Sequence, residues 1–262
     1  MMIPPDYLGG FSMRTAFVGL LCAAVVSGCV TTETVQFQPK GDQQAVTRDG
    51  VAGLVSTRKD SIVIARPASR QFQIGGRPVF VLAIYNRGRT PQEFRVANVS
   101  VTQTINGNDA QLQVITYEQL VSEEKTRQVV AAIGVGLAAA GNSMSASQAG
   151  YYNANSTVFT PRGTYQVHTT AYNPTAAAIA QSNANAQNAG MISATIERGQ
   201  ANMAVLERAV IKDNTLLPGE WYGGQLHIAP LVSQDGPKVY TISVTVGGDR
   251  HDIRIAQGAV SS

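Results

Sequence analysis

Residues 117–212 contain two long runs of helical periodicity, and this central block limits the folds that the chain can adopt. In the first run, apolar or small residues recur at spacings of three and four: Val130, Ile133, Leu137, Ala140 and Met144. The second run shows the same alternating spacings: Ile192, Ile196, Gly199, Met203, Leu206 and Val210. A seam of this kind needs a partner helix to cover it. We therefore expect the two runs to pack on each other as a helical hairpin.

The two expected helices have recognisable starting signals. Thr116 and Gln119 have the spacing of a capping box. Asn173 before Pro174 gives an N-cap followed by the residue best suited to the first helical position. Between the helices, residues 151–172 are polar and rich in Tyr, Ser, Thr and Asn, which favours either a loop or a small β-hairpin.

Patterns typical of β-strands lie on both sides of the helical block. Residues 78–85 are apolar on both alternating faces, as in a strand that is covered on two sides. Asn106-Gly107 marks a hairpin, and residues 239–246 alternate strictly before a turn at 247–249. The sequence therefore predicts a mainly β fold with an α insertion. We expect an antiparallel, immunoglobulin-like β-sandwich with the helical hairpin inserted between its strands.

The N-terminal segment ends in a short motif of small residues and a thiol: Val26-Ser27-Gly28-Cys29. An apolar run at residues 16–26 precedes it, and Arg14 after an expected true start at Met13 completes the pattern of a secretory signal. The run is too short to cross a bilayer, which takes about 20 residues. The motif resembles the processing site of bacterial lipoproteins, in which the cysteine is acylated. An ordinary secretory signal that happens to precede Cys29 is the alternative.

The resemblance to lipoproteins implies an anchor and an address. It implies that Cys29 carries acyl chains, which hold the protein at a membrane without a spanning helix. In such lipoproteins an Asp after the cysteine favours the inner membrane, and here the residue is Val30. The expected location is the outer membrane, facing the periplasm. The expected segments are a signal peptide in 1–28, a lipidated N-terminus and flexible tether in 29–58, the first part of the sandwich in 59–116, the helical hairpin in 117–212 with its polar segment at 151–172, and the second part of the sandwich in 213–258.

Cysteine content and charge exclude several classes of function. Removal of the signal peptide takes away Cys22, so Cys29 would be the last thiol, and disulfides, thiol catalysis and Cys-ligated metals are not expected. With 44% hydrophobic and 14% charged residues, the composition supports a real core. The net charge of +3 is too small to argue for nucleic-acid binding.

No pattern of residues indicates catalysis, a cofactor or a metal site. Ser122 and Lys125 match S-x-x-K, but the companion triplets S-D-N and K-T-G do not occur. Residues 134–139 match G-x-G-x-x-A inside a helical run with no strand before it. The three histidines are far apart in the sequence: His168, His227 and His251. We expect the last two to be packing residues on strands.

Three surfaces are candidates for binding. The first is a set of arginines that would bind anions, or would only protect strand edges: Arg66, Arg70, Arg77, Arg87, Arg89 and Arg95. The second is the seam of the hairpin, expected to bind a partner: Val130, Ile133, Leu137, Ile192, Ile196, Met203 and Leu206. The third is Trp221 with Tyr222, which would either bind a partner or plug the joint between hairpin and sandwich. Residues 129–141 favour close helix packing, with contact to lipid as the alternative.

Residues 218–224 spell PGEWYGG and follow the Ala/Asn/Gln-rich helical run. With the C-terminal β-hairpin, they resemble an uncharacterised family of bacterial envelope lipoproteins over about residues 60–256, a resemblance that implies no activity. Our leading hypothesis is a non-enzymatic envelope lipoprotein whose helical hairpin binds another envelope component or a second copy. One alternative is a cell-wall glycan-binding or hydrolytic protein with a site near Trp221 and His227. Another is an accessory subunit of a secretion or conjugation machine.

Overall fold

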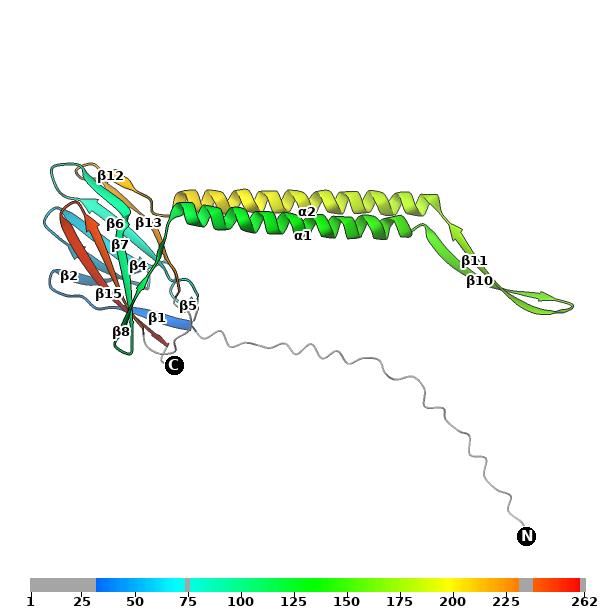
Figure 1. Cartoon of the computed structure of the whole chain (residues 1–262), viewed down its shortest axis with the longest axis horizontal. Coiled ribbons are helices and arrows are strands. Elements are labelled where there is room, and N and C mark those ends of the chain that lie inside the picture. The colour runs from blue at the N-terminus through cyan, green and yellow to red at the C-terminus, as the bar shows by residue number, and fades with distance from the viewer. Residues whose placement is uncertain (1–31, 74–75, 231–237, 260–262) are drawn as a thin grey trace, which may run out of the picture. The chain divides into compact units, whose positions relative to one another are not determined.

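The computed structural model describes residues 32–73, 76–230 and 238–259. The processing motif and the proposed lipidation site at Cys29 lie outside these residues. Within the described part, the chain forms two antiparallel β-sheets, two long helices and a separate β-hairpin (Figure 1).

The two sheets face each other as a sandwich. One sheet has seven strands in the described residues: β1 (Thr32–Phe37), β5 (Phe72–Gln73), β7 (Gln92–Ile105), β8 (Asn108–Leu112), β12 (Asn214–Leu216), β14 (Lys238–Val246) and β15 (Asp249–Ala259). The other has six: β2 (Gln43–Arg48), β3 (Val51–Thr57), β4 (Ser61–Pro67), β6 (Val79–Asn86), β9 (Val114–Ile115) and β13 (Trp221–Ile228). Their orders are β12-β7-β14-β15-β1-β5, with β8 also on β7, and β2-β3-β4-β6-β13-β9. Strands from before and after the helices therefore share both sheets, as the sequence predicts.

The core lies between the sheets. Its largest fully buried side chains come from both: Leu54, Phe80, Leu82, Ile84, Leu226 and Ile228 from one sheet, and Phe94, Ile242, Ile253 and Ile255 from the other. A buried polar link also joins the sheets. The His251 ring on β15 contacts Ser61 Oγ at 2.8 Å and Ser56 Oγ at 3.0 Å, which lie on β4 and β3. His251 is thus a packing residue, as expected, with both ring nitrogens satisfied.

The helical insertion is confirmed and its ends are where the capping signals place them. Helix α1 (Tyr117–Gln148) begins at Thr116 with a complete capping box to Gln119. Helix α2 (Pro174–Ala209) begins at Asn173, whose side chain accepts bonds from the first two free backbone N–H groups. The polar segment between the helices is a β-hairpin and not a loop. Its strands are β10 (Tyr151–Thr160) and β11 (Gly163–Tyr172).

The flexible tether expected at 29–58 is wrong for residues 32–57, which form β1, β2 and β3. β1 pairs with β15, and β3 pairs with β4. The segment looked irregular because β2, at the edge of its sheet, exposes nearly every side chain, so little of it is apolar. Val35 and Leu54 nevertheless enter the core.

Candidate interaction surface

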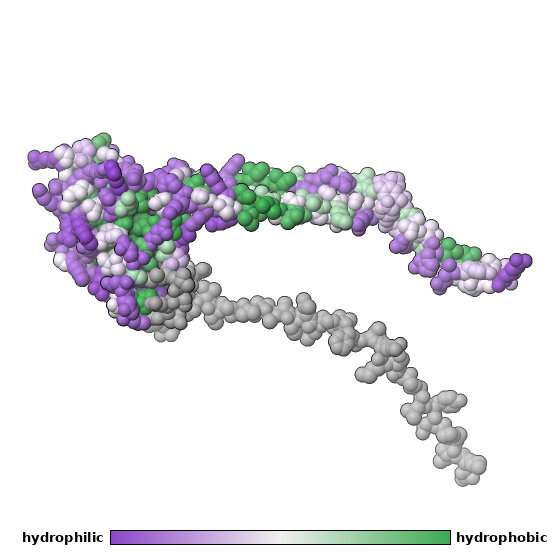
Figure 2. Space-filling model, viewed as in Figure 1, coloured by the Kyte–Doolittle hydropathy of each residue, from purple (hydrophilic) through white to green (hydrophobic). Residues whose placement is uncertain are grey.

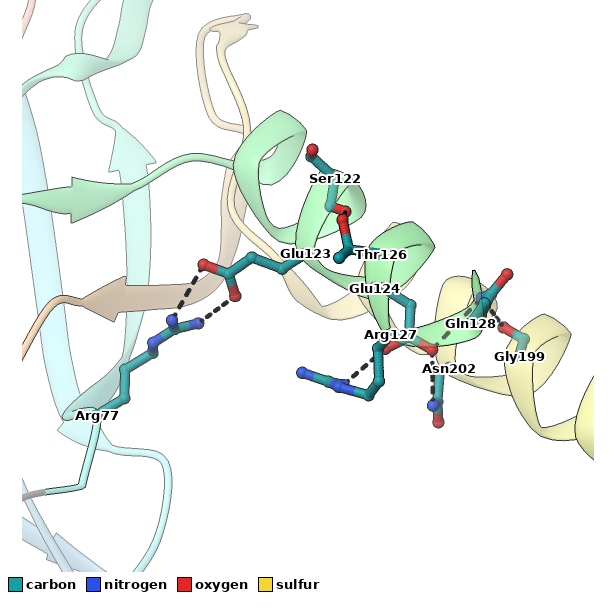
Figure 3. Close-up of polar contacts among 9 residues, drawn as sticks. All are labelled: Arg77, Ser122, Glu123, Glu124, Thr126, Arg127, Gln128, Gly199 and Asn202. Atoms are coloured by element: carbon teal, nitrogen blue, oxygen red, sulfur yellow. Dashed lines mark hydrogen bonds and ion pairs between the residues drawn. The ribbon is translucent and has the colours of Figure 1, made fainter. Parts of the chain in front are cut away.

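Small and polar side chains, and few large apolar ones, join α1 to α2 near the sandwich. Glu124 is 3% exposed and accepts hydrogen bonds from Asn202 Nδ2 at 2.9 Å and from Arg127 Nη1 at 2.6 Å (Figure 3). Gln128 Nε2 donates to the backbone oxygen of Gly199 at 3.1 Å. A Cβ on Gly199 would lie 2.9 Å from the Gln128 amide carbon, so the Gln128 side chain would have to move. These bonds fix the rotation of each helix about its own axis.

The same kind of contact continues toward the far end of the pair. Asn188 donates to the backbone oxygen of Ala139 at 3.2 Å and to Ser143 Oγ at 3.3 Å, and it accepts from Asn142 at 3.0 Å. The buried helix residues beyond this point are alanines: Ala146, Ala177 and Ala184. Small residues of this kind let two helix backbones approach closely. The small residues of 129–141, which were expected to do so, are mostly exposed, and a Cβ on Gly134, Gly136 or Gly141 would meet nothing within 4 Å.

The apolar residues that were predicted to pack between the two helices point away from the helix interface, so this prediction is wrong. Val130, Ile133 and Leu137 do not face α2, and Leu137 is 71% exposed. On α2, Ile192 and Ile196 are exposed too. The inward positions there are Met191, Thr195 and Asn202, which each precede by one residue the predicted Ile192, Ile196 and Met203. One residue is a rotation of about 100°, so the apolar stripe turns to the side. Gly199, Leu206 and Val210 fit both patterns, and Met203 is half-buried.

The outward residues form an apolar band that we call the outer stripe. Its members on α1 share one face of the helix: Val129, Val130, Ile133, Leu137 and Met144. The exposed apolar residues of α2 are more scattered, with Ile192 and Ile196 on one side of the helix and Ile179 and Val205 on others. Figure 2 shows apolar surface gathered over the middle of the helical pair. Helix α1 is long and apolar enough to cross a membrane, with a mean hydropathy of 1.5 over its most apolar 18 residues, of which only 6% are buried. The outer stripe therefore leaves a large hydrophobic surface in contact with water in a single copy.

The base of the hairpin is held to the sandwich by packing and by an ion pair. Ile115, Leu120 and Val210 form a small core at the joint. Arg77 from the sandwich contacts both carboxylate oxygens of Glu123 at 3.0 and 3.1 Å (Figure 3), and these bonds lower the pKa of Glu123. The ion pair is half-exposed, so its contribution to stability is small.

The PGEWYGG segment belongs to this joint. Tyr222 turns inward, contacts Phe94, and accepts a hydrogen bond from the backbone N–H of Lys212 at 2.9 Å, just beyond α2. A Cβ on Gly224 would lie 2.7 Å from the Ile211 nitrogen and 2.8 Å from the Ala209 oxygen. The motif thus lets the chain that leaves α2 lie close against β13. Tyr222 plugs the joint, which was one of the two interpretations.

Trp221 and His227 lie on the same strand and do not form one site. Trp221 is exposed and packs on Tyr85 with ring centroids 4.8 Å apart. His227 is six residues further along β13, which is about 20 Å at 3.3 Å per residue. Burial, together with nearby Arg77, lowers the pKa of His227. The structure therefore does not bring together the two residues of the proposed glycan site.

The six arginines of the predicted anion site are dispersed. Two face carboxylates: Arg77 pairs with Glu123 and Arg95 with Glu93, the latter at 2.7 Å. Three donate to backbone oxygens: Arg66 to Pro67, Arg70 to Asp49 and Arg87 to Arg58. Arg89 lies in the loop between β6 and β7. Anion binding by this set stays a prediction, and most of these side chains already have structural partners.

Ser122 lies in the first turns of α1, where its backbone oxygen accepts a bond from Thr126 (Figure 3). The Gly134–Ala139 segment lies inside α1, away from any strand–helix turn. In the described residues, no three His, Cys, Asp or Glu side chains are grouped as ligands of one metal ion.

The sequence did not reveal a cleft of about 710 Å³ at the joint. It lies between the β7–β8 part of its sheet and the start of α1, and its polar lining includes Tyr117, Glu118, Lys212 and Asp213. Several of these groups hold one another. Lys212 Nζ and Tyr117 Oη both contact Glu207, which raises the pKa of both donors and lowers that of Glu207. Asp213 accepts from the Val96 N–H at 2.7 Å. The polar groups that line the cleft therefore serve to hold the joint together.

Comparison of the chain with protein-family models, with curated proteins and with solved structures gave no match in any of the three.

Proposed function

We propose that the chain is a non-enzymatic lipoprotein of the bacterial envelope whose helical hairpin is a protein-binding module. The outer stripe carries this proposal. Its side chains are large, apolar and exposed, while polar contacts already close the helix pair. Large exposed apolar patches mark association surfaces in soluble proteins. The processing motif at Cys29 and Val30 after it support an anchor in the outer membrane, with the folded part in the periplasm.

Site-specific photo-crosslinking in intact cells tests the proposal. A photoreactive residue at Ile133 or Leu137 faces outward and should give discrete crosslinked species. The matched control is the same residue at Ala139, two positions from Leu137, where the side chain lies nearer to α2. Equal crosslinking at all three positions, or none, would argue against binding through the outer stripe. The identity of the captured protein separates a second copy or an envelope protein from a component of a secretion or conjugation machine.

A further inference from the structure

The β10–β11 hairpin has no structural role in the single copy. Its strands pair with each other over ten residues, and neither pairs with any other strand that the structure describes. It continues from the far ends of α1 and α2 (Figure 1). Nearly all of its side chains are exposed, and Phe159 reaches 80%. An isolated two-stranded ribbon is at best marginally stable in water.

The two faces of this hairpin differ in chemistry. One face is made of apolar and small side chains: Tyr152, Ala154, Ser156, Val158, Thr160, Tyr165, Val167, Thr169 and Ala171. The other carries amides and other hydrogen-bonding groups along its middle, and aromatic rings at its ends. The polar members are Asn153, Asn155, Thr157, Thr164, Gln166, His168 and Thr170, and the rings are Tyr151, Tyr172 and Phe159. Cross-strand bonds join these polar groups, as His168 to Asn155 at 2.6 Å and Thr170 to Asn153 at 2.9 Å. Alternation of this kind over about ten residues is typical of strands that face lipid on one side and water on the other.

Aromatic rings mark both ends of the ribbon. Tyr151 and Tyr172 pack together at the end near the helices, with ring centroids 4.9 Å apart, and Tyr152 is beside them. Phe159 and Tyr165 lie near the turn, Phe159 on the polar face. Only Tyr152 and Tyr165 lie on the apolar face, one near each end of the ribbon, where the aromatic belts of a membrane barrel are placed. Ten residues span about 33 Å, and a tilt of about 40° reduces this to about 25 Å, the height of the apolar band of such a barrel.

Charged side chains are nearly absent from the segment that contains the β10–β11 hairpin and the adjoining parts of α1 and α2. The 69 residues from 128 to 196 contain one Lys, Arg, Asp or Glu, which is Arg162. At the chain average of 14%, about ten would be expected. Arg162 lies in the β10–β11 turn, the part that would emerge on the far side of a membrane. The strands themselves thus carry no charge that hydrocarbon would have to exclude.

The strands suit lipid better than the helices do. Helix α2 runs beside α1 and carries five amide side chains within eight residues: Gln181, Asn183, Asn185, Gln187 and Asn188. Transfer of each amide into hydrocarbon costs about 4–8 kcal/mol. The hydropathy of α1 therefore does not make the pair a spanning element, and its outer stripe is better covered by protein.

A two-stranded ribbon cannot enter a bilayer alone. Each strand has one unpaired edge, with about five N–H and five C=O groups, and every such group costs several kcal/mol in hydrocarbon. Closure of several ribbons into a barrel pairs all of them. A second copy of this chain suits both unpartnered features. It offers the same strand edges for pairing, and it brings its own outer stripe beside the first.

We infer that copies of this chain join through β10 and β11 into a closed barrel that crosses a lipid bilayer, with the Tyr152 and Val167 face toward lipid. The inference rests on the proposed function, because it names a second copy as the partner. Each copy supplies two strands, so the barrel has an even number. The polar face of Asn155 and His168 lines the interior.

Vesicle permeabilisation with two neighbouring substitutions tests the inference. The full chain, purified in detergent, is diluted into phosphatidylethanolamine and phosphatidylglycerol vesicles that contain a self-quenching dye. The protein should release dye and give oligomers that survive unheated SDS electrophoresis. Val167→Lys places a charge at the middle of the lipid face and should lower release at least about 30-fold. Gln166→Lys, one residue away and also exposed, places the same charge inside and should keep release within a few-fold.

Three results would overturn the inference: no release by the unmodified chain, equal behaviour of the two Lys variants, or oligomers that form in buffer and do not bind vesicles. None of these three results bears on the proposed function, which the crosslinks at Ile133 and Leu137 test separately. Equal circular dichroism spectra of the two variants would show that neither substitution unfolds the chain.

Discussion

His251 should make the sandwich lose stability in mild acid. It is fully buried between Ser56 and Ser61, and burial lowers its pKa from 6.5 to about 4, against the opposing effect of Asp249. In the unfolded chain the ring takes up a proton below about pH 6.5. The folded state does not take up that proton until about pH 4. The unfolded state therefore binds more protons between these values, so the free energy of unfolding must fall as the pH falls through this window.

The size of the effect follows from the two pKa values. A difference of about 2.5 between 6.5 and about 4 corresponds to about 3 kcal/mol when the pH lies below both. At pH 5 the loss relative to pH 7.5 is about 2 kcal/mol. The neighbouring carboxylates Asp249 and Asp252 have lowered pKa values, so they withdraw stability only below about pH 4. His227 has a lowered pKa as well and adds a change of the same sign.

Urea unfolding at pH 7.5, 6 and 5 measures this loss, with the fluorescence of Trp221 on β13 as a reporter of the sandwich. His251→Gln should be less stable than the natural chain at pH 7.5, because the buried serines lose a partner, and its stability should change little down to pH 5. His227→Gln should keep most of the slope. Equal stability of the natural chain at pH 7.5 and 5, or an unchanged slope in His251→Gln, would refute the reasoning.

Three further changes have defined outcomes. Gly224→Ala should cost about 1–3 kcal/mol in urea unfolding, because the new methyl group meets the backbone at Ala209 and Ile211, whereas Gly248→Ala, with open space around it, should be nearly neutral. Glu124→Ala removes the buried acceptor of Asn202 and should destabilise the helix pair by about 1–3 kcal/mol, measured by thermal melting followed by circular dichroism. Glu123→Ala breaks only the half-exposed ion pair with Arg77 and should cost less than about 1 kcal/mol. Cys29→Ser should abolish palmitate labelling of the expressed protein; labelling that persists would contradict the proposed anchor.

Local signals in the sequence were enough to predict the architecture. The capping residues Thr116 and Asn173 fixed both helix starts, and Asn106-Gly107 formed the expected hairpin, with positive φ at both positions. Strand alternation on both sides of the helices was enough to infer a sandwich with an insertion. These features depend on a few neighbouring residues, and no distant contact competes with them.

The errors come from the use of hydrophobicity as a guide to burial. Residues 43–48 were too polar to suggest a strand, because an edge strand such as β2 buries one side at most. The apolar residues of β3, such as Leu54, were a signal that composition averaged over the segment concealed. The helix pair presents the opposite case. It buries alanines and amides and exposes Leu137, so the largest apolar residues mark the wrong face. A usable signal was present on α2, where Ala177, Ala184 and Asn188 recur at multiples of the helical repeat.

The helix pair and the β10–β11 ribbon share one property. In a single copy, the helix pair is closed by Asn188, Gln128 and Glu124, so the outer stripe adds no stability to it. The apolar face of the β10–β11 ribbon likewise adds no stability, because nothing in the single copy covers it. Both features cost free energy in water, at about 25 cal/mol for each Å² of apolar surface left uncovered. Sequence patterns report burial in the functional assembly as much as in the single chain. Stripe and ribbon become consistent with the rest of the fold when a neighbouring molecule covers them, which supports the proposed association.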